Sequence, residues 1–472
     1  TAVTNAVDYT KATIQIEITS DEDIGSIQIN GEEIEVPTKV DGKYIIEKEV
    51  SNNGNYIINV KNTKNEYKTA KVEVTEISED MDIQTAEQLV AFRERVNKGA
   101  TYEGRTVRLV NDLNLSGICG ETNSWEPIGS YEENNSYPFK GTFEGNNHTI
   151  DYLYINTAND YQGLFGYVEK GTIKGIVIGS NSSITGGGST GGIVGFIESA
   201  VVQNCGNNGQ ITSTSYNVGG IIGQAYNSSL ETCYNKANII ADGYVGGIVG
   251  YIWVEKNGKY NIENNYNEGN ITGGHIIGGI TGMTDTDDNN LIDVTIANCY
   301  NKGIITGTKT SRVGGIGARV AGNILVEYCY NLGEINNNGT GAFVGGVVGV
   351  HRLPANATSD IKAVINYCYN SANVISTGSV TGVGGLVGNN NQNCYVKNCI
   401  RLNSAEVKNG SITATSRMGT SSNNYTGRLI GNCYDANEPY IENVYIETEE
   451  NMPTVYNVVN RLNDGESSYW SN

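Results

Sequence analysis

The chain of 472 residues has 60 glycines, 6 prolines and 38% hydrophobic residues, which excludes a collagen or a disordered polymer. Its formal net charge of −20, from 31 basic and 51 acidic side chains, makes nucleic acid and anionic membrane surfaces unfavourable partners. No stretch approaches the roughly 20 apolar residues of a membrane helix, and no signal peptide opens the sequence, so we expect a soluble region whose export signal and anchor lie outside it.

Residues 1–78 alternate between apolar and polar positions, which predicts short strands with one buried face. The pairs Asn30-Gly31, Asp41-Gly42 and Asn53-Gly54 supply the positive-φ residues that tight hairpin turns need. These features predict a small antiparallel β-sandwich. The run from Gly54 to Ala70 resembles the last hairpin of bacterial immunoglobulin-like surface domains, which implies an Ig-like fold for residues 1–78.

Residues 82–99 show the pattern of an amphipathic helix. Thr85 can cap its start, with Gln88 completing a capping box, and Gly99 can end it. Leu89, Phe92 and Val96 share one face. We expect this helix to cover the open end of the structure that follows.

From residue 163 onward the chain repeats a glycine-bounded apolar motif, with steps of 27 to 43 residues between the closing glycines. Periods of this size predict stacked coils. The nine copies begin at Gly163, Gly191, Gly219, Gly246, Gly278, Gly314, Gly345, Gly384 and Gly427.

A second motif, centred on cysteine, runs in step with the first. Identical positions of a stacked parallel sheet lie about 4.8 Å apart, so we expect columns of buried, reduced thiols and an outer ladder of tyrosines. The odd total of nine cysteines excludes complete disulfide pairing. The repeated cysteines are Cys205, Cys233, Cys299, Cys329, Cys368 and Cys399, and the tyrosines are Tyr234, Tyr300, Tyr330 and Tyr369.

These repeats resemble the GLUG-motif family of bacterial surface proteins, and so does the entry segment, which includes Trp125-Glu-Pro-Ile-Gly129 and Phe139-Lys-Gly-Thr-Phe143. The resemblance implies an all-β fold, a right-handed parallel β-helix preceded by the sandwich and carrying one short capping helix. We divide the chain into the sandwich (1–78), the helix cap and first coils (79–162), the repeat solenoid (163–446) and a C-terminal cap (447–472).

The residues that could carry chemistry are few. His148 and His275 lie at turns, where structural roles are expected, and no Ser-His-Asp arrangement, phosphate loop or zinc spacing occurs. The acidic group Asp285, Asp287 and Asp288 can be interpreted as a calcium site or as paired carboxylates for glycoside hydrolysis. It lacks the glycine and distal glutamate of a calcium loop, and a solvated loop is the alternative. No other cofactor is expected.

The binding surface is predicted from length variation in one half of each repeat. An insertion can leave a solenoid only at a turn. Because the same half of each repeat varies in length, the inserted loops should lie along one edge. The loops are 253–260, 284–291 and 352–360, and unconstrained drift of surface loops is the alternative explanation. The predicted ligand-binding residues are Trp253, Tyr260, Asp285, Asp287, His351 and Arg352.

The preferred function is adhesion or ligand display by a non-catalytic, monomeric scaffold at the bacterial surface or outside the cell, with a host or matrix protein or a glycan as partner. A carbohydrate-active β-helix enzyme, either a polysaccharide lyase or a hydrolase, is the rival, and clustered carboxylates and basic residues on one face of the coils would favour it. The third alternative is a non-catalytic flank of a larger exported enzyme.

Overall fold

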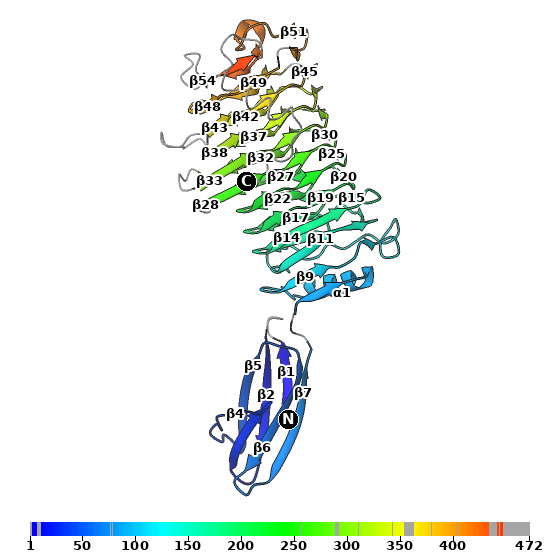
Figure 1. Cartoon of the computed structure of the whole chain (residues 1–472), viewed down its shortest axis with the longest axis vertical. Coiled ribbons are helices and arrows are strands. Elements are labelled where there is room, and N and C mark those ends of the chain that lie inside the picture. Colours follow the sequence, from blue (N-terminus) through cyan, green and yellow to red (C-terminus); the bar gives the residue numbers. More distant parts are fainter. Residues whose placement is uncertain are drawn as a thin grey trace.

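In the computed structural model, an elongated molecule carries a small sandwich at one end of a long stack of coils (Figure 1). None of the helices in the described part of the chain is long and apolar enough to cross a membrane. The structure describes residues 2–6, 11–75, 77, 79–255, 257–287, 292–309, 311–341, 343–353, 363–378, 380–402, 404–433, 441–442 and 444–446.

The sandwich consists of two antiparallel sheets that enclose their own apolar core, which includes Ile14, Ile27 and Ile58. Two of the three predicted turns form, since Asn30, Gly31, Asp41 and Gly42 all have positive φ. The third prediction is wrong, because Asn53-Gly54 joins strands of different sheets and only its glycine has positive φ. One sheet contains β1 (Ala2–Ala6), β2 (Ala12–Thr19) and β5 (Lys43–Val50). The other contains β4 (Glu32–Ile34), β3 (Ile24–Ile29), β6 (Gly54–Asn62) and β7 (Tyr67–Val74).

Helix α1 (Ala86–Val96) lies at the sandwich-proximal end of the coils (Figure 1). The capping box of Thr85 and Gln88 is present, and Leu89, Phe92 and Val96 are fully buried, as predicted. The Phe92 ring meets Phe139 edge-on at 5.6 Å. The helix is shorter than the predicted span, because the backbone after Val96 turns through Asn97 to Gly99, whose φ is 106°.

The remaining strands form a β-solenoid whose pairs are all parallel except β50 (Val407–Asn409) with β51 (Ile412–Thr413), which confirms the predicted fold class. We number its sheets in the order in which a coil visits them. Sheet 1 contains β8 (Met81–Ile83), β9 (Thr106–Leu109), β10 (Leu113–Asn114), β11 (Thr142–Asp151), β14 (Thr172–Ile178), β18 (Val201–Gln203), β19 (Gly206–Asn207), β23 (Ser229–Glu231), β24 (Tyr234–Asn235), β28 (Gly258–Glu263), β29 (Tyr266–Asn267), β33 (Ile292–Ala297), β34 (Tyr300–Asn301), β38 (Ile324–Glu327), β39 (Tyr330–Asn331), β43 (Ala363–Asn366), β44 (Tyr369–Asn370), β48 (Cys394–Lys397), β49 (Ile400–Arg401), β54 (Ile441–Glu442) and β55 (Tyr445–Ile446).

The other three sheets complete each coil, and a 3-10 turn (Ser421–Asn423) lies near the last coils. Sheet 2 contains β12 (Tyr154–Asn156), β15 (Ser183–Gly186), β20 (Gln210–Ser213), β25 (Ile239–Ala241), β30 (Ile271–Gly273), β35 (Ile305–Gly307), β40 (Ile335–Asn337), β45 (Val374–Ser376), β50 (Val407–Asn409) and β51 (Ile412–Thr413). Sheet 3 contains β16 (Thr190–Gly191), β21 (Val218–Gly219), β26 (Tyr244–Gly246), β31 (Ile276–Gly278), β36 (Arg312–Gly314), β41 (Phe343–Gly345), β46 (Gly382–Gly384) and β52 (Thr426–Gly427). Sheet 4 contains β13 (Phe165–Glu169), β17 (Val194–Glu198), β22 (Ile222–Tyr226), β27 (Val249–Val254), β32 (Thr281–Thr286), β37 (Gly317–Ala321), β42 (Val348–Arg352), β47 (Val387–Asn390) and β53 (Ile430–Cys433).

The repeated cysteines face the interior. All six are buried, and none of the nine cysteines, all of which lie in the described residues, forms a disulfide. Each repeated thiol contacts the backbone carbonyl two residues earlier, as Cys299 Sγ does with Ala297 O at 3.1 Å. In one coil Asn265 replaces the cysteine, and its Oδ1 accepts the Cys233 N–H at 2.8 Å. The predicted column of buried thiols is confirmed, with this one substitution.

A buried ladder of asparagine amides also runs through the interior of the coils. The Nδ2 of each rung but the last donates to the Oδ1 of the next at 2.8 to 2.9 Å, and every Nδ2 also donates to the carbonyl two residues later. The last rung, Asn370, donates to Gly385 O at 2.9 Å in place of a further asparagine. The motif glycines make room for it, because a Cβ at Gly247 would lie 2.6 Å from the Asn267 side chain. The rungs are Asn207, Asn235, Asn267, Asn301, Asn331 and Asn370.

Candidate functional site

Three of the predicted binding residues share one column on the outer face of sheet 4. Trp253 pairs in register with Asp285, Asp285 with Ala321, and Ala321 with Arg352. Parallel strands lie about 4.8 Å apart, so these side chains follow one another up the stack. We call this set, residues 253, 285, 321 and 352, the outer column.

Asp285 and Arg319 form an ion pair beside this column. Arg319 Nη2 lies 3.2 Å from Asp285 Oδ1, and both side chains are largely buried. Burial raises the pKa of Asp285 above its ordinary value, and the positive charges of Arg319 and Arg352 offset only part of that rise. A carboxylate in this position is stabilised by its guanidinium partners more than by water.

Next to the outer column lies a second, more buried line of outward residues, in which Tyr251 pairs with Met283 and Met283 with Arg319. Met283 and Ile276 form a small apolar cluster separate from the main core, and Tyr244 and Tyr251 pack against it. The Tyr251 ring lies 6.0 Å from Tyr244 and 6.4 Å from the Trp253 ring. Because Tyr244 and Ile276 belong to sheet 3, this cluster fills the angle between sheets 3 and 4.

His351 does not join the outer column, although it precedes Arg352. It is fully buried, and its Nδ1 lies 2.8 Å from Asn390 Oδ1. Burial lowers the pKa of the imidazole to about 4, and the Asn390 contact opposes this effect. The predicted placement of His351 on the common side is corrected here, because neighbouring residues of a strand point to opposite faces and Arg352 takes the outer one.

Tyr260 also lies away from the column, on β28 of sheet 1, where it packs against the main core. Burial raises the pKa of its phenol. Its strand directly follows β27, which carries Trp253, but the two strands belong to different sheets. Trp253, Asp285 and Arg352 therefore lie together, but on strands β27, β32 and β42 and not on loops, which corrects the predicted loop edge. Tyr260 and His351 lie elsewhere.

The proposed calcium ligands are only partly described. Asp285 is engaged by Arg319, and Asp287 is exposed, with its backbone N–H donating to Val254 O at 3.0 Å. Asp288 lies outside the described residues. Across the described ranges, no group of three or more His, Cys, Asp or Glu side chains is arranged to hold a metal ion.

The tyrosine ladder on sheet 1 offers little to a ligand. Tyr234, Tyr266, Tyr300 and Tyr330 stack with centroids 4.9 to 5.4 Å apart and ring planes within 14° of parallel. Tyr369 is buried beside Tyr330. The predicted ladder is confirmed, but since each ring faces another ring, the faces that would stack on a sugar are already covered.

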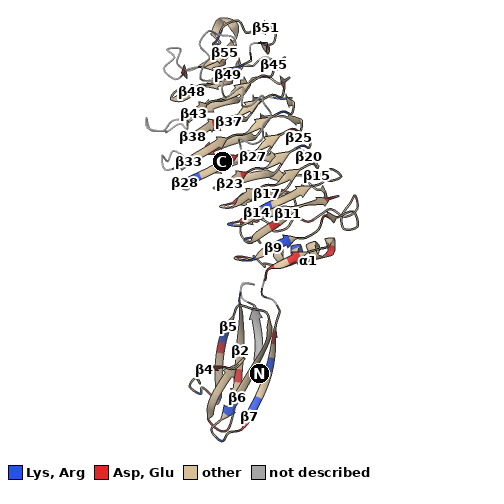
Figure 2. Ribbon diagram, in the orientation of Figure 1, with Lys and Arg blue, Asp and Glu red and all other residues tan. Residues whose placement is uncertain are grey.

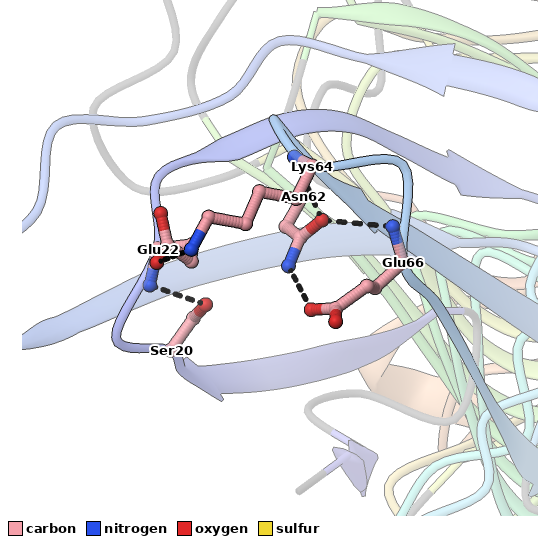
Figure 3. Close-up of polar contacts among 5 residues, drawn as sticks. All are labelled: Ser20, Glu22, Asn62, Lys64 and Glu66. Atoms are coloured by element: carbon pink, nitrogen blue, oxygen red, sulfur yellow. Dashed lines mark hydrogen bonds and ion pairs between the residues drawn. The ribbon is translucent and has the colours of Figure 1, made fainter.

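A described cavity of about 530 Å³ lies in the sandwich. It is an open groove lined by Ile16, Ile18 and Ile58 among others. At its rim Lys64 pairs with Glu22, and Asn62 binds Glu66, so the charged groups satisfy one another (Figure 3). Glu22 belongs to the acidic run Asp21-Glu22-Asp23, and Tyr44 donates to Asp23 at 3.1 Å, so two of its carboxylates have protein partners.

Comparison with known proteins places few limits on function. No family model matches the chain. Halomucin of Haloquadratum walsbyi is 27% identical over 139 residues, which are 28% of this chain and 2% of halomucin. The chain therefore spans a very small part of that relative.

Two solved structures resemble the chain. A putative immunoglobulin A1 protease from Bacteroides ovatus has 17% identity and a TM-score of 0.40, covering 75% of this chain and 84% of that one. A structure named IgA1 protease has 12% identity and a TM-score of 0.41, covering 85% of this chain and 31% of that one. Likeness at this level does not extend the activity named for those proteins to this chain.

Proposed function

We propose that this protein is an extracellular bacterial scaffold that displays a ligand-binding surface on the outer face of sheet 4. The observation that carries the proposal is the outer column, where Trp253, Asp285 and Arg352 stand in register on successive coils or two coils apart. An aromatic, an acidic and a basic side chain on one rigid face are the mixture that recognition surfaces use. Host or matrix proteins and glycans are the proposed partners.

A stiff scaffold suits display because the coils are rigidly tied together. The inward residues are almost completely buried, and backbone pairing continues from coil to coil along all four sheets. Side chains on the outer face are thus held at spacings that do not depend on ligand, which lowers the entropic cost of binding.

Binding to an array of glycans and matrix proteins tests the proposal. We expect Trp253→Ser to bind the array member that the wild-type protein captures at least tenfold more weakly, because truncating a central aromatic anchor typically costs about 2 kcal/mol or more. Ile240→Ser is the control, since Ile240 is 47% exposed on sheet 2, away from the column. Wild-type protein that captures no array member, or a Trp253→Ser variant that binds as well as wild type, would contradict the proposal.

A carbohydrate-active enzyme is the second candidate, and one observation favours it. Asp285 and Arg319 form a buried acid–base pair on one face of the coils, and the pKa of Asp285 is raised by burial. A hydrolase needs a second carboxylate roughly 5 to 10 Å from the first. Asp287 is the nearest described carboxylate in sequence, and it is an exposed residue directly after β32.

The two candidates differ in turnover. An enzyme would release reducing ends from a bound polysaccharide or form an unsaturated sugar that absorbs in the ultraviolet, and Asp285→Asn would abolish that product. A scaffold would bind the polysaccharide and leave its chain length unchanged. If the wild-type protein forms product and Asp285→Asn does not, the protein is an enzyme and the scaffold proposal is wrong.

A further inference from the structure

Three guanidinium groups gather beside the outer column of a strongly acidic protein. Arg312 lies on β36, Arg319 on β37 and Arg352 on β42, so two successive coils supply all three. Asp285 is the carboxylate paired with this group. The formal charge of the chain is −20, whereas these four side chains sum to two positive charges. Most of the solenoid ribbon is neither acidic nor basic (Figure 2).

Two of the three guanidinium groups have a buried donor without an acceptor in the described protein, while Arg312 is exposed. Arg319 uses Nη2 for Asp285 and Nη1 for the Met283 sulfur at 3.5 Å, and its buried Nε has no partner. The buried Nε of Arg352 also has none. Within the described residues, neither Arg312 nor Arg352 forms an ion pair. Buried donors without acceptors are costly, so an anion that accepts from them is favoured.

Strand register brings the three arginines together. Arg312 follows Ile276 and Arg319 follows Met283 in the stack, and Ile276 and Met283 pack in one cluster. Arg352 stands on the next coil, two residues beyond the partner of Arg319. The pKa of Arg312 is lowered, first by partial burial and then by the positive charges of Arg319 and Arg352. Mutual repulsion of this kind is relieved when an anion binds between like charges. An anion would therefore gain both hydrogen bonds and charge neutralisation here.

The neighbouring surface is mainly aromatic and apolar, with one carboxylate at its edge, where Trp253 Nε1 donates to Glu255 Oε2 at 3.5 Å. The Tyr251 ring lies 6.4 Å from Trp253, and beneath it Met283 and Ile276 are buried. Unlike the tyrosine ladder of sheet 1, these rings are tilted by 54° rather than stacked face to face. Rings in this arrangement can contact the apolar face of a sugar while the arginines hold its charged group.

Resting on the proposed function, we propose that this site binds an acidic saccharide, with Arg312, Arg319 and Arg352 pairing with its carboxylate groups. Tyr251 and Trp253 contact the adjoining sugar rings. The basic groups span only one coil step, about 4.8 Å along the stack, which fits one or two sugar carboxylates. A long polyanion such as DNA would extend beyond this patch onto the rest of the protein, whose negative net charge repels it.

Calorimetric titration of the full chain with trigalacturonate tests the ligand class, and the methyl ester of the same trisaccharide is the neutral control. We expect the acid to bind at least tenfold more tightly than the ester, and its affinity to fall with salt. Arg312→Gln and Arg352→Gln should each weaken binding about tenfold or more, because a charged hydrogen bond contributes roughly 1.5 to 3 kcal/mol. Lys236→Gln, at the residue directly after β24 of sheet 1, removes the same charge elsewhere and should change nothing.

Three results would overturn the inference. The first is equal binding of the acid and the ester. The second is unchanged binding by both arginine variants when their circular dichroism matches that of the wild type. The third is competition by sulfate or phosphate that is as strong, mole for mole, as competition by the trisaccharide. The last would mean an anion site without sugar recognition. If acidic sugars fail while another array ligand still depends on Trp253, the inference is wrong and the proposed function stands. If nothing binds in either assay, both are wrong.

Discussion

The asparagine ladder should be a main source of stability in the solenoid, and Asn301→Ala tests this. The Asn301 amide donates to Gly303 O at 2.9 Å and to Asn331 Oδ1 at 2.8 Å, and it accepts from Asn267 Nδ2 at 2.8 Å. At roughly 1 kcal/mol for each net hydrogen bond, their loss costs about 3 kcal/mol. Buried acceptors at Gly303 and Asn331 left without this donor raise the cost further.

Equilibrium unfolding in urea, followed by circular dichroism, measures this loss. Repeat proteins can unfold in stages, so the midpoint and slope of the transition must both be compared with wild type. Asn336→Ala is the control, because Asn336 is the outward residue of β40 between two buried neighbours. Its free energy of unfolding should change by no more than about 0.5 kcal/mol. An Asn301→Ala variant as stable as this control would refute the account of the ladder.

Three further predictions concern single residues. Thr232 has a φ of 56° at a position where other coils carry Asn204, Asn264 and Asn298. Because asparagine adopts positive φ more readily than a β-branched residue, Thr232→Asn should stabilise the protein by about 0.5 to 1 kcal/mol in the same urea assay. A lower midpoint would contradict this. The pKa of His351 is about 4 in the folded protein, below its usual 6.5. Its contribution to stability is therefore complete above pH 6.5 and lost as the pH falls toward 4, on the order of 3 kcal/mol. His351→Gln should remove that part of the pH dependence, and an unchanged profile would show that His351 is not buried neutral. Finally, mass spectrometry after brief alkylation of the native protein should find Cys433, which is partly exposed, modified before the six repeated cysteines. Early labelling of Cys299 or Cys329 would contradict their burial.

Much of the fold could be predicted because local patterns and tertiary structure agree. Asn30-Gly31 and Asp41-Gly42 form turns that few other residue pairs tolerate, and both have positive φ in the structure. The cysteines recur once per coil, and a parallel stack converts such a recurrence into a column without further information.

The asparagine ladder was missed although its signal is present. Asn207 and Asn235 stand two residues after a repeated cysteine, and the same offset recurs in later coils. An asparagine is ordinarily assigned to the surface, since burying an unpaired amide is costly. Stacking removes that cost, because each amide supplies both a donor and an acceptor to its neighbours. A polar residue at a fixed offset from buried positions is thus evidence of a ladder in a solenoid.

The site was harder to predict because its residues come from different offsets in different coils. Arg312, Arg319 and Arg352 show no common motif in the sequence. Their proximity depends on coil-to-coil register, which the variable connections hide. The error at His351 has a simpler cause. Strand β42 continues through Arg352, so alternation alone places one of the pair inside and the other outside.

The narrow cross-section of the coils explains why recognition belongs on the outer face. A Cβ on Gly279 would lie 2.0 Å from Gly315 O, and one on Gly247 would meet Asn267, so the interior admits no added atom at these corners. Interior positions are therefore restricted from coil to coil to residues that are apolar or that find a buried partner. In one such column Ile252, Thr284 and Val320 are followed by His351, whose imidazole contacts Asn390. The outer column has no such restriction and changes from Trp253 to Asp285 to Ala321 without disturbing the pairing beneath it. Specificity can thus vary between coils while every backbone hydrogen bond of the stack is retained, provided that the ligand contacts only the outward side chains.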